Sequence, residues 1–110
     1  MNEPFVLGKD VMETPAGEGV LRKVLAHSPG IMMVQIDFAQ GAIGASHAHP
    51  HEQVTYIISG RFQFTNGGEE WEVGPGDSLY FAPGVQHGTV CVEAGRLLDV
   101  FTPCREDFLK

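Results

Sequence analysis

The sequence has little cysteine and no long apolar run, and both absences narrow the class of protein. Two cysteines in 110 residues do not make a disulfide framework, so Cys91 and Cys104 are expected to be small buried apolar side chains. No apolar stretch approaches the roughly 20 residues of a membrane-spanning helix, so no membrane partner is expected. The first ten residues lack a basic patch followed by an apolar stretch, so we expect no signal peptide and a cytoplasmic location.

Positive charge is also scarce. Lysine and arginine number 7 against 14 aspartates and glutamates, which gives a formal net charge of -7. Nucleic acid and anionic membranes attract basic surfaces, so neither is an expected partner. A small anionic ligand remains compatible with this charge if local positive charge overcomes the negative field of the protein. The length fits a single domain over residues 1–110.

The third absence is a helical pattern. No segment keeps a 3.6-residue apolar period over ten residues, whereas alternation with a period of two recurs throughout. Strands are expected over residues 20–26, 32–38, 53–58, 61–65, 71–73, 78–82, 89–92 and 97–101. Turns are expected at residues 59–60, 66–68, 74–77 and 93–95. Eight short strands predict an all-β fold, a closed or nearly closed antiparallel barrel or jelly roll.

Histidine, in contrast, is concentrated at one place, because three of the five histidines are His47, His49 and His51. Residues two apart on a strand share a face, so His47 and His49 are expected to point into the barrel together, while Pro50 interrupts the strand before His51. Two such imidazoles repel each other if charged and lack partners if buried and neutral. A metal ion, which binds neutral imidazole, removes both problems. The pair therefore predicts a metal site.

Two spaced motifs resemble those of the cupin family. The first is Gly41, five residues, His47-Ala48-His49, three residues, Gln53, six residues and Gly60. The second is Gly76-Asp77, four residues, Ala82-Pro83-Gly84, two residues and His87. The resemblance implies a double-stranded β-helix barrel, the cupin jelly roll. It also implies one divalent transition metal ion, such as Zn, Ni, Fe or Mn, held by His47, His49, Gln53 and His87.

The sequence departs from the cupin motifs at the fourth ligand, where glutamate is usual and this chain has Gln53. Glu52 lies one position early and has the wrong parity for a strand that resumes at residue 53, so Gln53 is the predicted ligand. Whether Glu52 or His51 joins the site stays open. Three imidazoles and a neutral amide leave the full double charge of the ion, which favours an anionic substrate and a developing enolate.

Finer features resemble one subgroup of small cupins, the pectin-degradation (KdgF-like) family, from about residue 20 onward. The string HAHPHEQVTY over residues 47–56 and the tail over residues 99–108 carry this likeness. Members convert 4,5-unsaturated monouronates, made by pectin and alginate lyases, into linear keto acids. The resemblance implies a small anionic sugar acid as the substrate and catalytic roles for Asp99, Phe101 and Arg105.

The residue types suit these implied roles. Asp99 shares its parity with Leu97 and Phe101, and a carboxylate among inward-facing apolar residues is costly unless it has a partner or a task. Phe101 is expected to be a wall of the pocket. Arg105 could fork onto a substrate carboxylate, and the alternative is an ion pair with its acidic neighbours at 106 and 107. Tyr56 and Tyr80 are expected to pack in the core.

Two other functions stay open at this point. One is a metal-dependent cupin dioxygenase, which would consume oxygen and need a redox-active metal. The other is a non-enzymatic cupin that binds a small molecule. A homodimer is expected, because small barrels with edge strands often pair.

Overall fold

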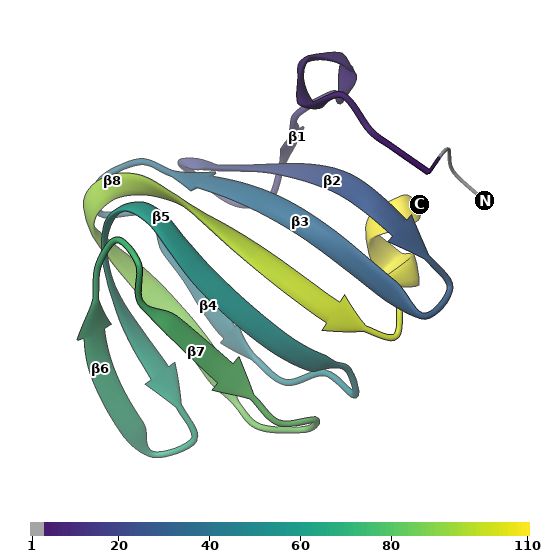
Figure 1. Cartoon of the computed structure of the whole chain (residues 1–110). Coiled ribbons are helices and arrows are strands. Elements are labelled where there is room, and N and C mark those ends of the chain that lie inside the picture. Colours follow the sequence, from purple (N-terminus) through teal and green to yellow (C-terminus); the bar gives the residue numbers. More distant parts are fainter. Residues whose placement is uncertain (1–3) are drawn as a thin grey trace.

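The structure is a computed structural model in which residues 4–110 are described, and their regular structure is almost entirely β (Figure 1). In chain order the elements are η1 (Gly8–Asp10), β1 (Thr14–Pro15), β2 (Val20–Ser28), β3 (Ile31–Phe38), β4 (Ile43–His47), β5 (Glu52–Asn66), β6 (Glu69–Val73), β7 (Ser78–Phe81), β8 (His87–Thr102) and η2 (Glu106–Leu109). The two η elements are short 3-10 helices, and residues 4–110 contain no α-helix. No helix in this part of the chain is long and apolar enough to span a membrane. The all-β prediction is confirmed.

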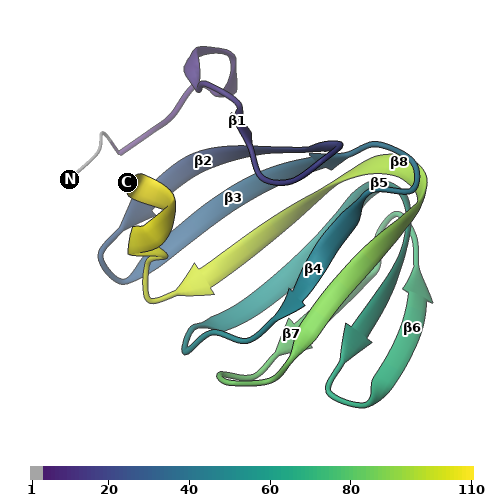
Figure 2. The ribbon, with the colours of Figure 1, turned by 180° about the vertical axis from the view of Figure 1, so that it is seen from behind.

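All strand pairs are antiparallel and belong to one folded sheet. The strand order is β1-β2-β3-β8-β5-β6, while β4 also pairs with β8 and β7 with β5. In Figure 1, β4 lies behind β5, and in the reverse view of Figure 2 it lies in front. The sheet is therefore folded over into two layers that enclose a core, which is the expected double-stranded β-helix.

Two of the predicted turns, at residues 59–60 and 93–95, are wrong. Both segments lie inside the long strands β5 and β8, at a place where the register between the two strands shifts. Gly60 has a φ of +80°, and a Cβ there would lie 2.6 Å from the carbonyl oxygen of Glu93. A Cβ on Gly95 would collide with the backbone of Ser59. Glycine at both positions lets the two bent strands cross closely. The predicted strands 53–58 and 61–65 are therefore parts of β5, and the predicted strands 89–92 and 97–101 are parts of β8.

The other two turns are confirmed. Asn66 pairs with Glu69 around the tight Gly67-Gly68 hairpin. The 74–77 turn closes when the Asp77 amide donates to the Gly74 carbonyl over 3.0 Å, and the Asp77 side chain accepts from the Gly74 amide over 2.7 Å. Strand β1 was not predicted, because it has only two residues. Of β4, only its last residue, His47, was expected on a strand, because all of β4 is at least partly exposed and shows no apolar alternation.

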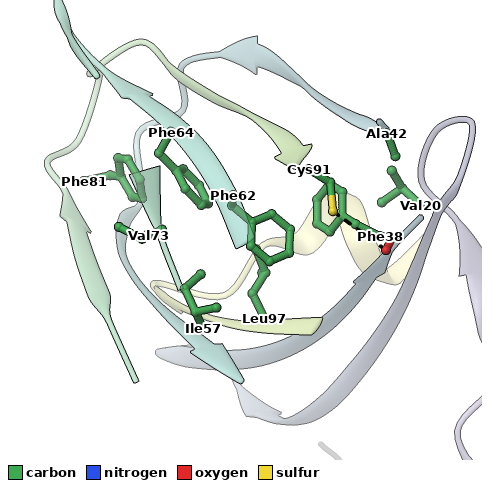
Figure 3. Close-up of a cluster of buried hydrophobic side chains, with 10 residues drawn as sticks. All are labelled: Val20, Phe38, Ala42, Ile57, Phe62, Phe64, Val73, Phe81, Cys91 and Leu97. Carbon is green, nitrogen blue, oxygen red and sulfur yellow. Dashed lines mark hydrogen bonds between the residues drawn. The ribbon is translucent and has the colours of Figure 1, made fainter. Parts of the chain in front are cut away.

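The core lies between the two layers (Figure 3). Its main cluster consists of Val20, Phe38, Ala42, Ile57, Phe62, Phe64, Val73, Phe81, Cys91 and Leu97. A second cluster of Met32, Val34, Phe101 and Cys104 has Phe108 of η2 packed against it. Both cysteines are buried and free, as predicted.

The prediction that Tyr56 and Tyr80 pack in the core is wrong. Tyr56 is 50% exposed and Tyr80 is 49% exposed. The inward face of β5 begins with Gln53, Thr55 and Ile57, so the apolar residues between them point outward. The apolar residues at alternate positions of this part of β5 therefore lie on its outer face, because the inner face at this end of the barrel carries polar residues.

Candidate metal centre

Three histidines meet at one end of the barrel, and each reaches it from a different segment. His47 ends β4 and pairs across the sheet with His87, the first residue of β8. His49 lies in the loop after β4, and its carbonyl accepts a hydrogen bond from the Gly84 amide over 2.8 Å. The prediction that His47 and His49 share a strand is therefore wrong, although both side chains reach the site.

The three imidazoles are close enough to share one ion. One nitrogen each of His47, His49 and His87 lie within 4.8 Å of one another. The Nδ1 atom of His47 lies 2.8 Å from the Ala45 carbonyl oxygen, and that of His87 lies 3.1 Å from the Val85 carbonyl oxygen. Backbone contacts at Nδ1 orient such rings and leave Nε2 for a metal.

Gln53, the second residue of β5, brings its side-chain oxygen to the same place. Its amide nitrogen donates to Thr55 Oγ1 over 2.9 Å and to Asp99 Oδ1 over 3.2 Å. Its oxygen consequently faces the histidines and lies 3.0 Å from His49 Nε2. Two atoms that bind one ion at about 2.1 Å lie roughly 3.0–3.4 Å apart. The Gln53 side chain, which is 5% exposed, thus fits the role of fourth ligand.

The protonation of this cluster also suits a metal. Desolvation by burial lowers the pKa of His87 to about 4, and it also lowers the pKa of His49. Both rings therefore offer neutral lone pairs at neutral pH. His49 Nδ1 is buried with no hydrogen-bond partner. An all-imidazole and amide donor set fits a divalent transition metal ion, and the residues present fit the ion that the motifs imply.

Glu52, the alternative ligand, lies outside the site. Its side chain is exposed and accepts a 2.6 Å hydrogen bond from the Tyr80 hydroxyl on the outer face of the sheet. His51 lies near the cluster, with its ring 5.3 Å from that of His49, but among the described residues the compact group consists of His47, His49 and His87.

Asp99 lies beside the candidate ligands, buried at 7% exposure. Thr55 donates a hydrogen bond to its Oδ1 over 2.5 Å, in addition to the Gln53 amide. Desolvation by burial raises the pKa of Asp99 to about 6, and the hydrogen bonds from Thr55 and Gln53 oppose that rise. Both hydrogen bonds go to Oδ1, so Oδ2 receives none from the described residues and stays available to a ligand.

Arg105 is held by an acidic neighbour. Its Nε and terminal nitrogen contact the two carboxylate oxygens of Asp107 at 3.0 and 2.9 Å. Its guanidinium lies 4.2 Å from the centre of the Phe108 ring and 5.1 Å from that of Phe101. The ion pair with Asp107 is the alternative that the sequence left open for this arginine.

A cavity of about 290 Å³ lies beside the candidate ligands inside the barrel. His47, Gln53, His87, Asp99 and Phe101 line it. Phe101 is therefore one of the side chains that line the pocket. Sequence reasoning gave no role in the site to Arg22, Phe108 or the hydrogen-bond donor Thr55. The available signal for Arg22 was its position two residues after the buried Val20 on β2, which places both side chains on the same face of the strand.

Comparisons with known proteins bear on the same residues. Residues 34–101 match the cupin domain family, and this range contains both spaced motifs. The pectin degradation protein KdgF of Dickeya dadantii (strain 3937) is 40% identical over 102 residues, 88% of this chain and 93% of that protein. An RmlC-like cupin from Shewanella frigidimarina NCIMB 400 superimposes with a TM-score of 0.94 and 39% identity, covering 97% of this chain and 96% of that chain. The structure of KdgF from Halomonas sp. superimposes with a TM-score of 0.91 and 31% identity, covering 97% of this chain and 99% of that chain.

Proposed function

The chain belongs to the cupin family and, within it, to the KdgF pectin-degradation proteins, and on that premise we propose that it is a metal-dependent enzyme that opens 4,5-unsaturated monouronates to linear keto-uronates. The observation that carries the proposal is one cavity lined by two members of the three-histidine cluster, His47 and His87, and by the buried carboxylate of Asp99, which has a free oxygen. A protein that only binds a ligand does not require a buried carboxylate with one oxygen free of hydrogen bonds. An enzyme that moves a proton does require such a group.

The substrate of this reaction is a cyclic hemiacetal with a C4–C5 double bond and a carboxylate on C5. The C1 hydroxyl loses its proton, the C1 aldehyde forms, and the bond between C1 and the ring oxygen breaks. The electron pair stays on the former ring oxygen as an enolate. Protonation of C4 then gives the 5-keto acid, so the reaction is an isomerisation that needs one proton moved between two atoms.

Asp99 is the group that moves this proton. Thr55 and Gln53 fix the carboxylate through Oδ1, so Oδ2 can accept the C1 proton and return it at C4. Phe101 forms the apolar wall that excludes water from the enolate. Arg105 adds positive charge beside Phe101, partly neutralised by Asp107.

His47, His49, Gln53 and His87 would hold the divalent ion. When bound, the ion supplies positive charge for the oxygen that becomes the enolate. The four ligands are neutral, so they leave that charge undiminished. This matters in a protein with a net charge of -7, because the substrate is also an anion.

The test is the loss of unsaturated-uronate absorbance, measured against the spontaneous opening of the same sugar. The protein is chelated, reloaded with Zn, Ni, Fe or Mn, and assayed with sugars from both pectin and alginate. We expect opening above background with at least one metal and a fall to background after chelation. Opening at the background rate with every metal would overturn the proposal, and oxygen uptake by the Fe or Ni form would then favour the dioxygenase.

A further inference from the structure

Among the described residues 4–110, Arg22 is the only lysine or arginine whose side chain lines the cavity. It lies on β2 and pairs across the sheet with Ile36, which in turn pairs with Leu97 on β8. Asp99 follows Leu97 by two positions and points to the same face. Arg22 on β2 and Asp99 on β8 are therefore separated by two strand spacings, or about 10 Å. This distance leaves room for one sugar ring between the two side chains.

The two arginines near this cavity differ in their partners. Arg105 is paired with Asp107 through both carboxylate oxygens. Arg22 is half-buried and forms no hydrogen bond or ion pair with the residues that the structure describes. Its guanidinium lies 4.0 Å from the centre of the Phe108 ring, on which Arg105 also stacks at 4.2 Å. Burial lowers the pKa of Arg22, and the nearby Asp107 carboxylate opposes that change.

The carboxylate nearest to Arg22, Asp107, is already bonded to Arg105 through both oxygens, so the half-buried Arg22 guanidinium has lost water without gaining an ion pair of its own. Its planar face is fixed by Phe108, and its donors are free to face the cavity. We propose that Arg22 binds the carboxylate of the substrate and selects sugar acids over neutral sugars, with the ring lying between Arg22 and the histidine cluster. Phe108 acts as a positioning residue that holds the plane of the Arg22 guanidinium.

This inference rests on the proposed function, so its test includes a probe that does not react. Metal-loaded wild-type protein is titrated with galacturonate, a saturated uronate, and with galactose, its neutral counterpart. The variants are Arg22→Gln, Arg22→Lys and, as a matched control, Arg96→Gln, which removes a guanidinium that pairs with Asp37 at the surface. The readouts are affinity by calorimetry, KM and kcat for the unsaturated uronate, metal content and Tm.

We expect Arg22→Gln to weaken galacturonate binding and raise KM by about 10–100-fold, the range for a lost charge-assisted contact, with a smaller change in kcat. Arg22→Lys should be intermediate, because lysine keeps the charge without the fork. Weak galactose binding, metal content and Arg96→Gln should stay at wild-type values. Unchanged galacturonate affinity in a folded Arg22→Gln protein would overturn the inference.

If Arg22→Gln does not fold, the wild-type protein decides the question. The NMR signal of the Arg22 Nε–H group should shift with galacturonate but not with galactose, and an unmoved signal overturns the inference. Normal uronate opening by Arg22→Gln would reject Arg22 and leave the proposed function standing. If galacturonate binding depends on Arg22 but the protein opens no unsaturated uronate, the role of Arg22 stands and the proposed function is rejected.

A second surface lies on the outside of the sheet and is defined here as the outer patch. It consists of Met33, Val54, Tyr56, Tyr80, Leu98 and Val100, which come from four neighbouring strands and line one shallow hollow. Tyr80 pairs with Val54, Val54 with Val100, and Val100 with Met33, so the patch is continuous across the sheet. The hollow contains no charged residue.

The geometry points to a second copy of this chain as the occupant of the outer patch. Two chains of charge -7 repel each other, and this hollow is a place where they meet with few opposing like charges, because the one carboxylate bonded to the patch, Glu52, does not line it. A two-fold contact places the patch on itself. Patches of this kind present on the order of 500 Å², so two copies bury about 1,000 Å², the lower end for a specific interface. The dimer should therefore dissociate on dilution.

Sedimentation of the wild-type protein and two matched variants tests this interface. Val54→Glu puts a charge in the outer patch, and Val92→Glu puts the same charge on another exposed stretch of β8. We expect a dimer for wild type and Val92→Glu at high concentration and a monomer for Val54→Glu. A wild-type protein that is monomeric at all concentrations, or a dimer unaffected by Val54→Glu, would overturn the assignment.

Discussion

The side-chain amide of Gln53 donates a 3.2 Å hydrogen bond to Asp99 Oδ1, across 46 positions of the sequence. This contact joins a candidate metal ligand to the candidate catalytic carboxylate. It requires an N–H donor at position 53, which glutamine has and a glutamate, the usual cupin residue, lacks when ionised. A glutamate would also bring a second negative charge beside Asp99. Glutamine at the fourth ligand position is therefore matched to the aspartate behind it.

Gln53→Glu should keep the metal and lose rate. A carboxylate is a competent ligand, so metal content should equal that of the wild type or rise. The same carboxylate halves the net charge of the site and repels Asp99, so kcat/KM for the unsaturated uronate should fall by at least about tenfold. Metal analysis and the absorbance assay measure both quantities. Turnover as fast as that of the wild type would remove the electrostatic reason for glutamine.

Asp99→Asn should separate chemistry from metal binding. Asparagine keeps an oxygen for Thr55 and Gln53 but cannot take up a proton at the second atom. A positioned acid or base contributes about 10²–10⁴-fold, so the rate should fall by that factor while metal content stays unchanged. Asp37→Asn, a surface change, is the control. If Asp99→Asn remains active, Asp99 is not the proton carrier.

The same substitution has an expected effect on the stability of the metal-free protein. Burial raises the pKa of Asp99 from 3.8 to about 6, so the folded state holds this proton more tightly than the unfolded state. Stability from this group is therefore present at acid pH and is lost as pH rises from about 4 to about 6. Over that window, Asp99→Asn should gain on the order of 3 kcal/mol relative to wild type. Urea unfolding of chelated protein at pH 4 and pH 7 measures the difference, and a constant gap would contradict it.

Sequence reasoning could name the candidate ligands because the spaced motifs that carry the family resemblance contain them. The spacing of His47, Gln53 and His87 is a property of the chain, and the structure brings all three together. The two long strands were not predicted as such, because glycine at positions 60 and 95 is as typical of a turn as of a bend inside a strand. Only the crossing strand, which is distant in sequence, requires glycine there.

The partners of Arg22 and Arg105 could not be read from the sequence for a similar reason. Both arginines stack on Phe108, a residue of the C-terminal 3-10 helix whose position depends on how the tail packs against the barrel. Parity places Arg22 on an inward face but does not say which charges lie nearby. Tertiary contacts decide which of the two arginines is paired and which lines the cavity.

Removing one candidate ligand should release the metal without unfolding the barrel. His87→Ala deletes an imidazole at the start of β8, and the remaining donors should bind divalent metal at least about tenfold more weakly. Chelation should lower the Tm of wild-type protein, because bound metal stabilises the folded state, and should leave that of His87→Ala unchanged. His27→Ala, away from the cluster, should behave like wild type. Equal metal content in His87→Ala would contradict the assignment.

The crossing of β5 and β8 gives a prediction about stability alone. Gly60 has a φ of +80°, and an added Cβ would lie 2.6 Å from one carbonyl oxygen and 2.7 Å from another. Gly60→Ala should therefore lower the free energy of unfolding by about 2–4 kcal/mol, the sum of backbone strain and overpacking. Gly68→Ala is the matched control, because a Cβ there meets no atom within 4 Å, and it should change stability by less than about 0.5 kcal/mol. Urea unfolding of chelated protein measures both variants. Equal stabilities would mean that the strands cross less closely at Gly60 than the structure shows.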